Sequence, residues 1–160
     1  MRKILVIAAV LAGLSCFAGG EEFEEGDYYE LDRWSLGAAG CLELPQGGAH
    51  FSRRAGVAIR GGYALDEFWT LEAQGEWAEN KYAVSAGFLW LWWGYERLDP
   101  FFVFGAKDWI GVDWGPYAGV GAFWHIDDHW SLRAEVAPML GIEDGCEMVY
   151  SFSFGVQRSW

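Results

Sequence analysis

Hydrophobic and polar residues alternate along most of the chain, and the last segment shows this most clearly. Its apolar positions are Tyr150, Phe152, Phe154, Val156 and Trp160. Small or polar residues lie between them, and Arg158 is the one charged residue on the apolar side. A period of two places apolar side chains on one face of a β-strand. The segment is therefore predicted to be a strand with one apolar face.

The same alternation recurs in earlier segments. The apolar faces span residues 34–44, 57–63, 69–77, 82–92, 102–106, 118–124, 130–140 and 150–160. The parity of the fifth segment is ambiguous, because Phe101 and Val103 are apolar as well. Strands of about 11 residues are long enough to cross a bilayer. The pattern predicts an all-β fold, an eight-stranded antiparallel up-and-down transmembrane β-barrel spanning residues 34–160.

An internal repeat supports this topology. LDEFWTLEA at residues 65–73 matches IDDHWSLRA at 126–134, with an offset of 61 residues. Each copy reads as an acidic turn that leads into an aromatic residue and a new strand. In an up-and-down barrel the second and third strands are joined at the same end as the sixth and seventh, so the repeat predicts two equivalent turns.

Aromatic residues indicate which face meets lipid. The chain has 11 Trp, 7 Tyr and 11 Phe. At one end each strand contributes one aromatic residue, and the set is Trp34, Tyr63, Trp69, Trp92, Phe102, Trp124, Trp130 and Trp160. Such a girdle is typical of the boundary between lipid tails and headgroups. A soluble barrel would point its bulky apolar face inward, so we expect this one to point outward into lipid.

The opposite face carries charges that are expected to fill the barrel interior. An eight-stranded barrel has room inside only for side chains, so no open pore is expected. We predict an ion-pair network of Arg60, Glu72, Glu76, Arg133 and Glu135. The expected register sets Tyr63 opposite Trp69 and therefore Arg60 opposite Glu72. Arg133 is expected in the same layer, with Glu76 or Glu135 one layer further along.

The N-terminal region reads as a secretion signal followed by an acidic tail. Arg2 and Lys3 precede an apolar run and small residues, which predicts a signal peptide over residues 1–18 with cleavage after 18 or 20. The expected periplasmic tail, residues 19–33, includes seven acidic residues between Glu21 and Asp32. With a net charge of −12 for the whole chain, nucleic acid is not an expected partner.

From Trp34 to Trp160 the sequence resembles the small outer-membrane β-barrels of the OmpA and OmpX type. Alternating aromatics that end on Trp160 carry this resemblance best. In that family the last strand is the signal read by the outer-membrane assembly machinery, and Arg158 departs from the usual apolar residue. The resemblance implies a bacterial outer-membrane location and a monomer. Both chain ends are expected to be periplasmic, together with the turns at residues 64–68, 94–100 and 126–129.

Several functions remain open. The leading expectation is a structural barrel that contributes to envelope integrity, and no cofactor is expected. An adhesin is one alternative. A conduit for small hydrophobic molecules is another, since Leu89, Leu91 and Met139 could form an apolar patch in the lumen. Separately, three basic residues are expected near the outer rim, where they either bind lipopolysaccharide phosphates or serve as ordinary solubilising charges. They are Arg53, Lys81 and Lys107.

Catalysis and metal binding are not expected. His50 and Ser52 have the two-residue step found in barrels that deacylate lipid A, but no acidic residue follows them closely. His125 and His129 flank an acidic turn, which polarity alone explains. Register places Cys41 opposite about residue 153 and roughly 23 Å from Cys146, beyond the ~7 Å that a disulfide allows between Cα atoms. Two free thiols are predicted.

Overall fold

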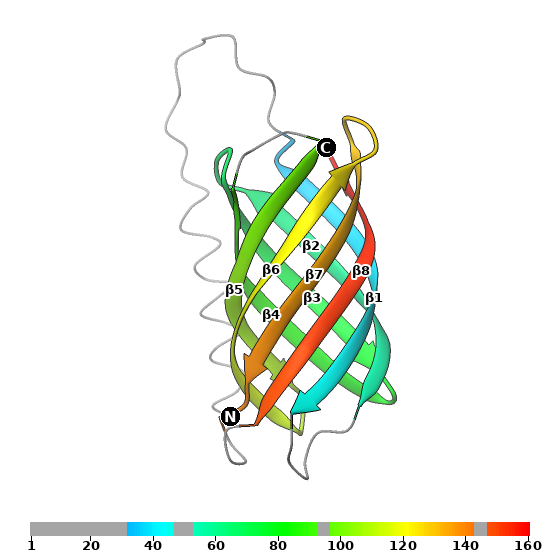
Figure 1. The fold of residues 1–160 in the computed structure, drawn as a ribbon, viewed down its shortest axis with the longest axis vertical. Coiled ribbons are helices and arrows are strands. Elements are labelled where there is room, and N and C mark those ends of the chain that lie inside the picture. The colour runs from blue at the N-terminus through cyan, green and yellow to red at the C-terminus, as the bar shows by residue number, and fades with distance from the viewer. Residues whose placement is uncertain (1–31, 47–52, 93–96, 143–146) are drawn as a thin grey trace. The chain divides into compact units, whose positions relative to one another are not determined.

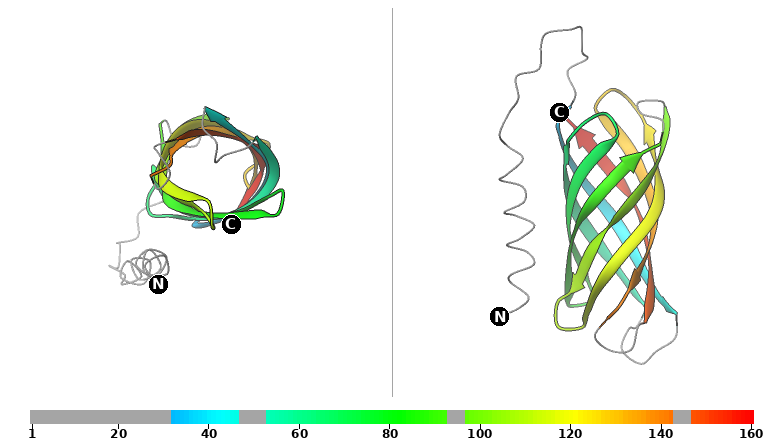
Figure 2. Two further views of the ribbon diagram at one scale, coloured as in Figure 1. Left: turned by 90° about the horizontal axis from the view of Figure 1, so that it is seen from below. Right: turned by 90° about the vertical axis from the view of Figure 1, so that its left-hand side faces the viewer.

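Eight antiparallel strands close into one barrel, which confirms the predicted fold class (Figure 1). The computed structural model describes residues 32–46, 53–92, 97–142 and 147–160. The strands are β1 (Trp34–Gln46), β2 (Arg54–Ala64), β3 (Trp69–Ala78), β4 (Lys81–Leu91), β5 (Leu98–Trp109), β6 (Asp113–His125), β7 (Trp130–Leu140) and β8 (Met148–Ser159). Each strand pairs with its neighbours in sequence, and β8 pairs with β1, so the strands form a closed ring (Figure 2).

The barrel is apolar outside and largely polar inside. On β2 the side chains of Val57 and Ile59 are 57% and 64% exposed, whereas Ala58 and Arg60 between them are buried. Large apolar side chains gain by leaving water, so an outer surface of this kind favours lipid. On β5, the strand of ambiguous parity, Phe102 and Phe104 face outward while Phe101 and Val103 face the lumen, the barrel interior.

The pairing of β1 with β8, which closes the barrel, has the predicted register. Trp34 and Trp160 exchange two backbone hydrogen bonds, of 3.0 and 2.9 Å. Cys41 lies opposite Ser153, as expected from that pairing. Cys41 is a free, buried thiol. Cys146 lies outside the described residues, so the second free thiol stays a prediction.

The two copies of the repeat form equivalent turns. An Asp66 Oδ1 atom accepts the backbone N–H groups of Phe68 and Trp69 at 2.8 and 2.7 Å. At the matching position, Asp127 Oδ1 accepts those of His129 and Trp130 at 2.9 and 2.8 Å. Both turns lie at the end of the barrel that also holds Trp34 and Trp160, here called the chain-end rim.

The predicted β2–β3 register is wrong by two residues. Glu72 lies opposite Gly62, and Arg60 lies opposite Gln74. The cause is the tightness of the turn, because Leu65 N–H already bonds to the Trp69 carbonyl at 2.8 Å. Only three residues remain in the loop, where the sequence pattern suggested five.

The described connections at the opposite end, the far rim, are short. Glu79 and Asn80 form a two-residue turn with φ angles of 47° and 67°, the left-handed geometry that suits the twist of a hairpin. At the other tight turn Gly111 has a φ of 75°.

At the chain-end rim the expected turn at 94–100 is too long, because β5 already begins at Leu98.

The ladder between β6 and β7 is interrupted. Tyr117 pairs with Met139 and Val120 with Val136, but the positions between these two pairs are skipped. The skipped positions include Pro138, which has no N–H to donate to the neighbouring strand. Extending the same register places Pro116, which also lacks an N–H, opposite Leu140.

Candidate functional site

A network of four charges lies in the lumen, formed by Arg60, Glu72, Arg133 and Glu135. Arg133 on β7 reaches across to Glu72 on β3 with two bonds, one of them 3.0 Å from Nη2 to Oε1. It also donates to Glu135 Oε2 from Nη2 at 2.5 Å and from Nε at 3.1 Å. Arg60 Nη1 donates to the same Glu135 oxygen at 3.1 Å. Two cations therefore balance two carboxylates.

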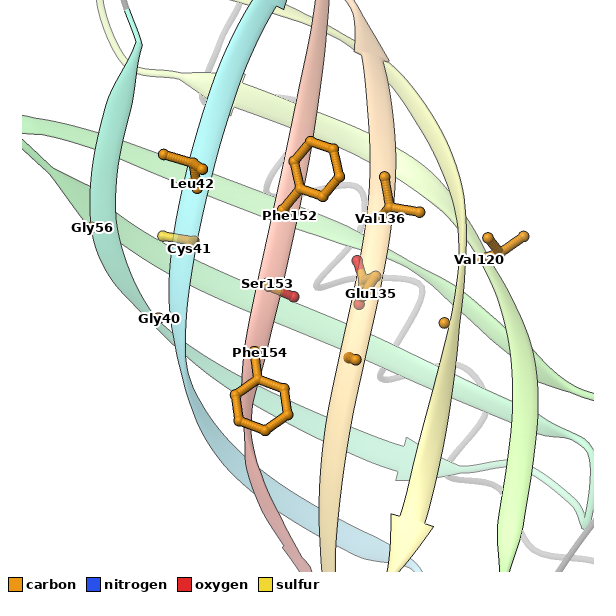
Figure 3. A pocket seen from close by; sticks show the side chains of 12 residues that line it. Gly40, Cys41, Leu42, Gly56, Val120, Glu135, Val136, Phe152, Ser153 and Phe154 are labelled. Atoms are coloured by element: carbon orange, nitrogen blue, oxygen red, sulfur yellow. The ribbon is translucent and has the colours of Figure 1, made fainter.

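Aromatic rings and polar side chains support the same network. The Arg133 guanidinium lies 4.6 Å from the centroid of Phe101 and 5.3 Å from that of Phe123. Such cation–π contacts are strongest where water is excluded, and the Arg133 side chain is only 2% exposed. Arg60 Nη2 also donates to Ser153 Oγ at 3.0 Å. Figure 3 shows Glu135 on β7 beside Ser153 on β8 and Cys41 on β1.

The structure brings together four of the five residues that the sequence assigned to this network. The predicted direct pair of Arg60 and Glu72 does not form, because their strands are shifted by two residues. They are joined instead through Glu135 and Arg133. The fifth residue, Glu76, belongs to a different cluster.

That cluster is a network of three charges, formed by Glu43, Glu76 and Lys107. Lys107 Nζ lies 2.7 Å from Glu43 Oε1 and 2.7 Å from Glu76 Oε2. Ser151 Oγ donates to Glu43 Oε1 at 2.6 Å. Isolated buried charges are costly unless paired, and here the lysine pairs with both carboxylates.

Two parts of this cluster differ from the sequence interpretation. Lys107 was expected near the outer rim, but it is buried in the lumen with 6% exposure. It shares inward parity with Phe101 and Val103, the residues that made this strand ambiguous. Glu43 was missed altogether, although its position between the outward-facing Leu42 and Leu44 places it inside.

Apolar side chains cover much of the remaining lumen wall. One cluster contains Leu89, Phe101, Val103, Phe123 and Ala137, with Leu91 packed against it. A second contains Ala78, Ala83, Trp109, Met139 and Val149. Trp109 is fully buried, and the cations of Arg54 and Lys107 each lie 5.1 Å from its ring centroid. The apolar surface is thus larger than the expected patch of Leu89, Leu91 and Met139, and it is closely packed.

Little free volume is left between the two charge networks. The cavity there measures about 20 Å³ and is lined by Cys41, Gln74, Glu76, Tyr117 and Ser153 among others. A space of this size holds about one water molecule. A larger hollow of about 730 Å³ is open to the outside on the wall of β1, β6, β7 and β8. Its apolar side chains, including Phe152 and Phe154, face away from the lumen (Figure 3).

The expected girdle residues all lie at the chain-end rim. Six of them are more than a third exposed, namely Trp34, Trp92, Phe102, Trp124, Trp130 and Trp160. Rings on neighbouring strands are in contact: the centroids of Trp34 and Tyr63 are 4.8 Å apart, and those of Trp92 and Phe102 are 5.5 Å apart. Trp69 stacks on Trp90, which extends the aromatic surface over β3 and β4.

The C-terminal strand presents its aromatic side chains outward. Phe152, Phe154 and Val156 are 42%, 61% and 38% exposed. Tyr150 lies near the far rim, where its hydroxyl donates to Gln46 Oε1 at 3.2 Å. Arg158 shares the outward face and lies over the Trp130 ring, 5.6 Å from its centroid.

The histidines that can be placed are engaged with carboxylates. His125 Nε2 lies 2.9 Å from Asp99 Oδ2, and His129 Nδ1 lies 3.2 Å from Asp32 Oδ2. Within the described residues no three His, Cys, Asp or Glu side chains are grouped as a metal site would require. His50 and Ser52 lie outside the described residues.

Solved structures with the same architecture are known. OprG from Pseudomonas aeruginosa matches with a TM-score of 0.61 at 8% identity, over 80% of this chain and 96% of its own. The N-terminal β-barrel domain of OprF from the same organism matches with a TM-score of 0.57 at 15% identity, over 79% and 97%. A de novo designed transmembrane β-barrel matches at 0.59 and 14%, over 79% and 95%. This chain has the fold of the small outer-membrane β-barrels.

At these identities the likeness establishes the fold of the barrel. No protein-family model matches the chain. No curated protein matches it in sequence. In the part of the chain that the structure describes, there is no helix of the length and hydropathy needed to cross a membrane.

Proposed function

We propose that this chain is a structural barrel of the bacterial outer membrane that contributes to envelope integrity and has no open pore. The observation that carries the proposal is the filled lumen. Two ion-pair networks and two apolar clusters occupy the interior and leave a cavity of about 20 Å³ between the networks. A hydrated ion or a nutrient needs a continuous path, and the packed side chains block one.

The alternatives have less support. A conduit for hydrophobic molecules needs an empty apolar channel, whereas the apolar side chains here are packed into two clusters, one of them around Trp109, and Tyr117 packs against both. Adhesins of this type usually carry long surface loops. The described far-rim turns at residues 79–80 and 110–112 are short, so they offer little surface for a host partner.

Single-channel recording tests the closed lumen. The refolded protein in a planar bilayer should show no stable conductance. Replacing Arg133 by alanine removes the centre of the four-charge network and should open a narrow leak. Ser85→Ala is the matched control, because Ser85 also lines the cavity but carries no charge. A large, stable conductance of the unmodified protein would overturn the closed-lumen proposal.

The envelope role needs a cellular measurement. Cells that lack the protein should take up more of a hydrophobic fluorescent dye, and the unmodified gene should restore the barrier. The Arg133→Ala gene should restore it less completely than Ser85→Ala. Equal dye uptake with and without the protein would contradict a role in envelope integrity.

Two partners belong to this proposal. The outward aromatic face of β8, from Tyr150 to Trp160, is proposed as the signal for the assembly machinery. Arg53 and Lys81, both exposed near the far rim, are proposed as contacts for lipopolysaccharide phosphates. The buried Lys107 is not part of that surface.

A further inference from the structure

Three exposed arginines lie at the chain-end rim, each held by an aromatic residue. The Arg158 guanidinium lies over the Trp130 ring at 5.6 Å, and the Arg97 guanidinium lies over the Trp124 ring at 5.7 Å. Arg33 Nη1 donates to the Tyr63 hydroxyl at 3.3 Å. Each charge is therefore fixed beside the girdle rather than extended into solution.

The position of Arg158 shows how deep in the membrane these arginines lie. It lies opposite Trp130 in one ladder and opposite Leu36 in the other, so it belongs to the outward face. Trp130 and Leu36 are 41% and 53% exposed. On a lipid-facing wall a cation is costly at the bilayer centre and nearly tolerated at the interface. A long arginine side chain can extend from the apolar level to the headgroup level.

The arginines occupy one sector of the rim. In barrel order, Arg97 precedes β5, Trp124 lies on β6, Trp130 on β7, Arg158 on β8 and Arg33 just before β1. The flank from β3 to β4 has stacked rings instead. Among the described residues the remaining exposed cations, Arg53 and Lys81, lie at the far rim.

Two of the nearby carboxylates, Asp127 and Asp32, are already engaged. Asp127, in the turn between β6 and β7, accepts two backbone N–H groups. Asp32 is paired with His129. The turn lies beyond Trp130 toward water, whereas Arg158 is level with the Trp130 ring. Asp127 also attracts Arg158 electrostatically, but its turn hydrogen bonds hold its carboxylate on the water side of the Trp130 ring. This leaves the lipid side of Arg158 for an external anion.

We propose that Arg97 beside Trp124 and Arg158 beside Trp130 each bind the phosphate of an anionic phospholipid in the leaflet at the chain-end rim. The inference rests on the proposed membrane location. The ligand must offer an anion at headgroup level and an apolar chain below it, because Arg158 is flanked by exposed Leu36 and Trp130. The planar guanidinium pairs well with phosphate oxygens, and the indole rings suit the interface.

Electron paramagnetic resonance of spin-labelled lipids tests this. The full chain is refolded in phosphatidylcholine vesicles that contain trace spin-labelled phosphatidylglycerol or phosphatidylcholine. The boundary lipid of the unmodified barrel should favour phosphatidylglycerol. The preference should fall by about fivefold for each arginine replaced, the factor expected for one interfacial cation. The variants are Arg97→Gln, Arg158→Gln and their combination, and high salt should also weaken the preference.

A matched variant separates this site from general charge. Arg33→Gln removes an exposed cation from the same rim but outside the proposed pair, and should leave the preference unchanged. Heat-modifiable migration on gels reports folding of every variant. A folded barrel that shows no lipid preference, or keeps it without Arg97 and Arg158, overturns this inference alone. A chain that does not insert at all overturns the proposed membrane function as well.

Discussion

Glu72 and Arg133 occupy the same position in the two copies of the repeat and form an ion pair with each other across the lumen. The repeat offset of 61 residues is also the separation of the paired side chains. Strands β3 and β7 lie opposite each other in an eight-stranded ring, so equivalent residues face each other near the axis. Because one copy has a carboxylate and the other a guanidinium, the repeat provides its own counter-ion.

Removing Glu72 should strongly destabilise the barrel. Glu72→Ala leaves Arg133 with one carboxylate shared with Arg60, and breaking a buried pair from one side costs about 3–5 kcal/mol. Urea unfolding in lipid vesicles measures the loss. The exchange variant, Glu72→Arg with Arg133→Glu, should recover part of it because the pair is re-formed in reverse. Unchanged stability of Glu72→Ala would show that the pair contributes nothing.

Arg60 and Glu72 should be energetically coupled although they do not touch. Both contact Glu135 or Arg133, so Arg60→Ala with Glu72→Ala should cost less than the two single changes added together. The coupling between Glu72 and Arg133 should be larger, because those two are in direct contact. Double-mutant cycles of urea unfolding in lipid vesicles measure the two coupling energies. Strictly additive losses for either pair would contradict the network.

Lys107 should behave as an interior residue. Lys107→Met leaves Glu43 and Glu76 buried without their cation, and we expect a loss of about 3–5 kcal/mol in the free energy of unfolding. Lys81→Met, at an exposed position on the adjacent strand, is the control and should change stability by no more than about 0.5 kcal/mol. Equal effects of the two substitutions would place Lys107 at the surface.

The turn aspartate should titrate at low pH. Two backbone N–H groups, from His129 and Trp130, hold the pKa of Asp127 below its ordinary value. The stabilisation is therefore present above the pKa of the unfolded chain and is lost as the pH falls through the lower folded value. NMR titration of the Asp127 carboxyl measures this directly, and Asp127→Asn should remove that part of the acid dependence. A pKa at or above the ordinary value would contradict the turn geometry.

The sequence predicted the barrel well where one pattern governed many residues. Alternation set the strands, and the terminal Trp160 opposite Trp34 set the closing register that places Cys41 opposite Ser153. It failed where one side chain controls the backbone. The capture of N–H groups by Asp66 tightens a turn and shifts the β2–β3 register, yet such an aspartate reads as an ordinary loop residue.

The interior charges were only partly predictable. Parity correctly placed Arg60, Glu72, Arg133 and Glu135 inside, but ion pairs depend on register, which was two residues off between β2 and β3. Lys107 was misplaced because β5 is apolar on both faces, so alternation could not assign its side. The ambiguous parity of β5 also hid the inward position of Phe101, which packs with Phe123 in the lumen.

The interrupted ladder between β6 and β7 offers a further test. Pro138→Ala supplies a donor toward β6, and one added hydrogen bond should stabilise the barrel by about 0.5–1.5 kcal/mol. Hydrogen exchange of amides near Tyr117 and Met139 should slow. Leu132→Ala, on the intact part of the same strand, serves as a control that should not slow it. Faster exchange in Pro138→Ala would show that proline is the better residue there.

The interrupted β6–β7 ladder also indicates which pair of strands would separate first under mechanical force. A closed ring can be opened only by separating one pair of neighbours, and the termini at β1 and β8 are usually regarded as the natural place. Here that junction has a continuous ladder from Ser35 to Gln46, whereas the β6–β7 ladder is broken beside Pro138. Pulling or lateral membrane tension should therefore split the wall between two internal strands first, and leave the chain ends joined.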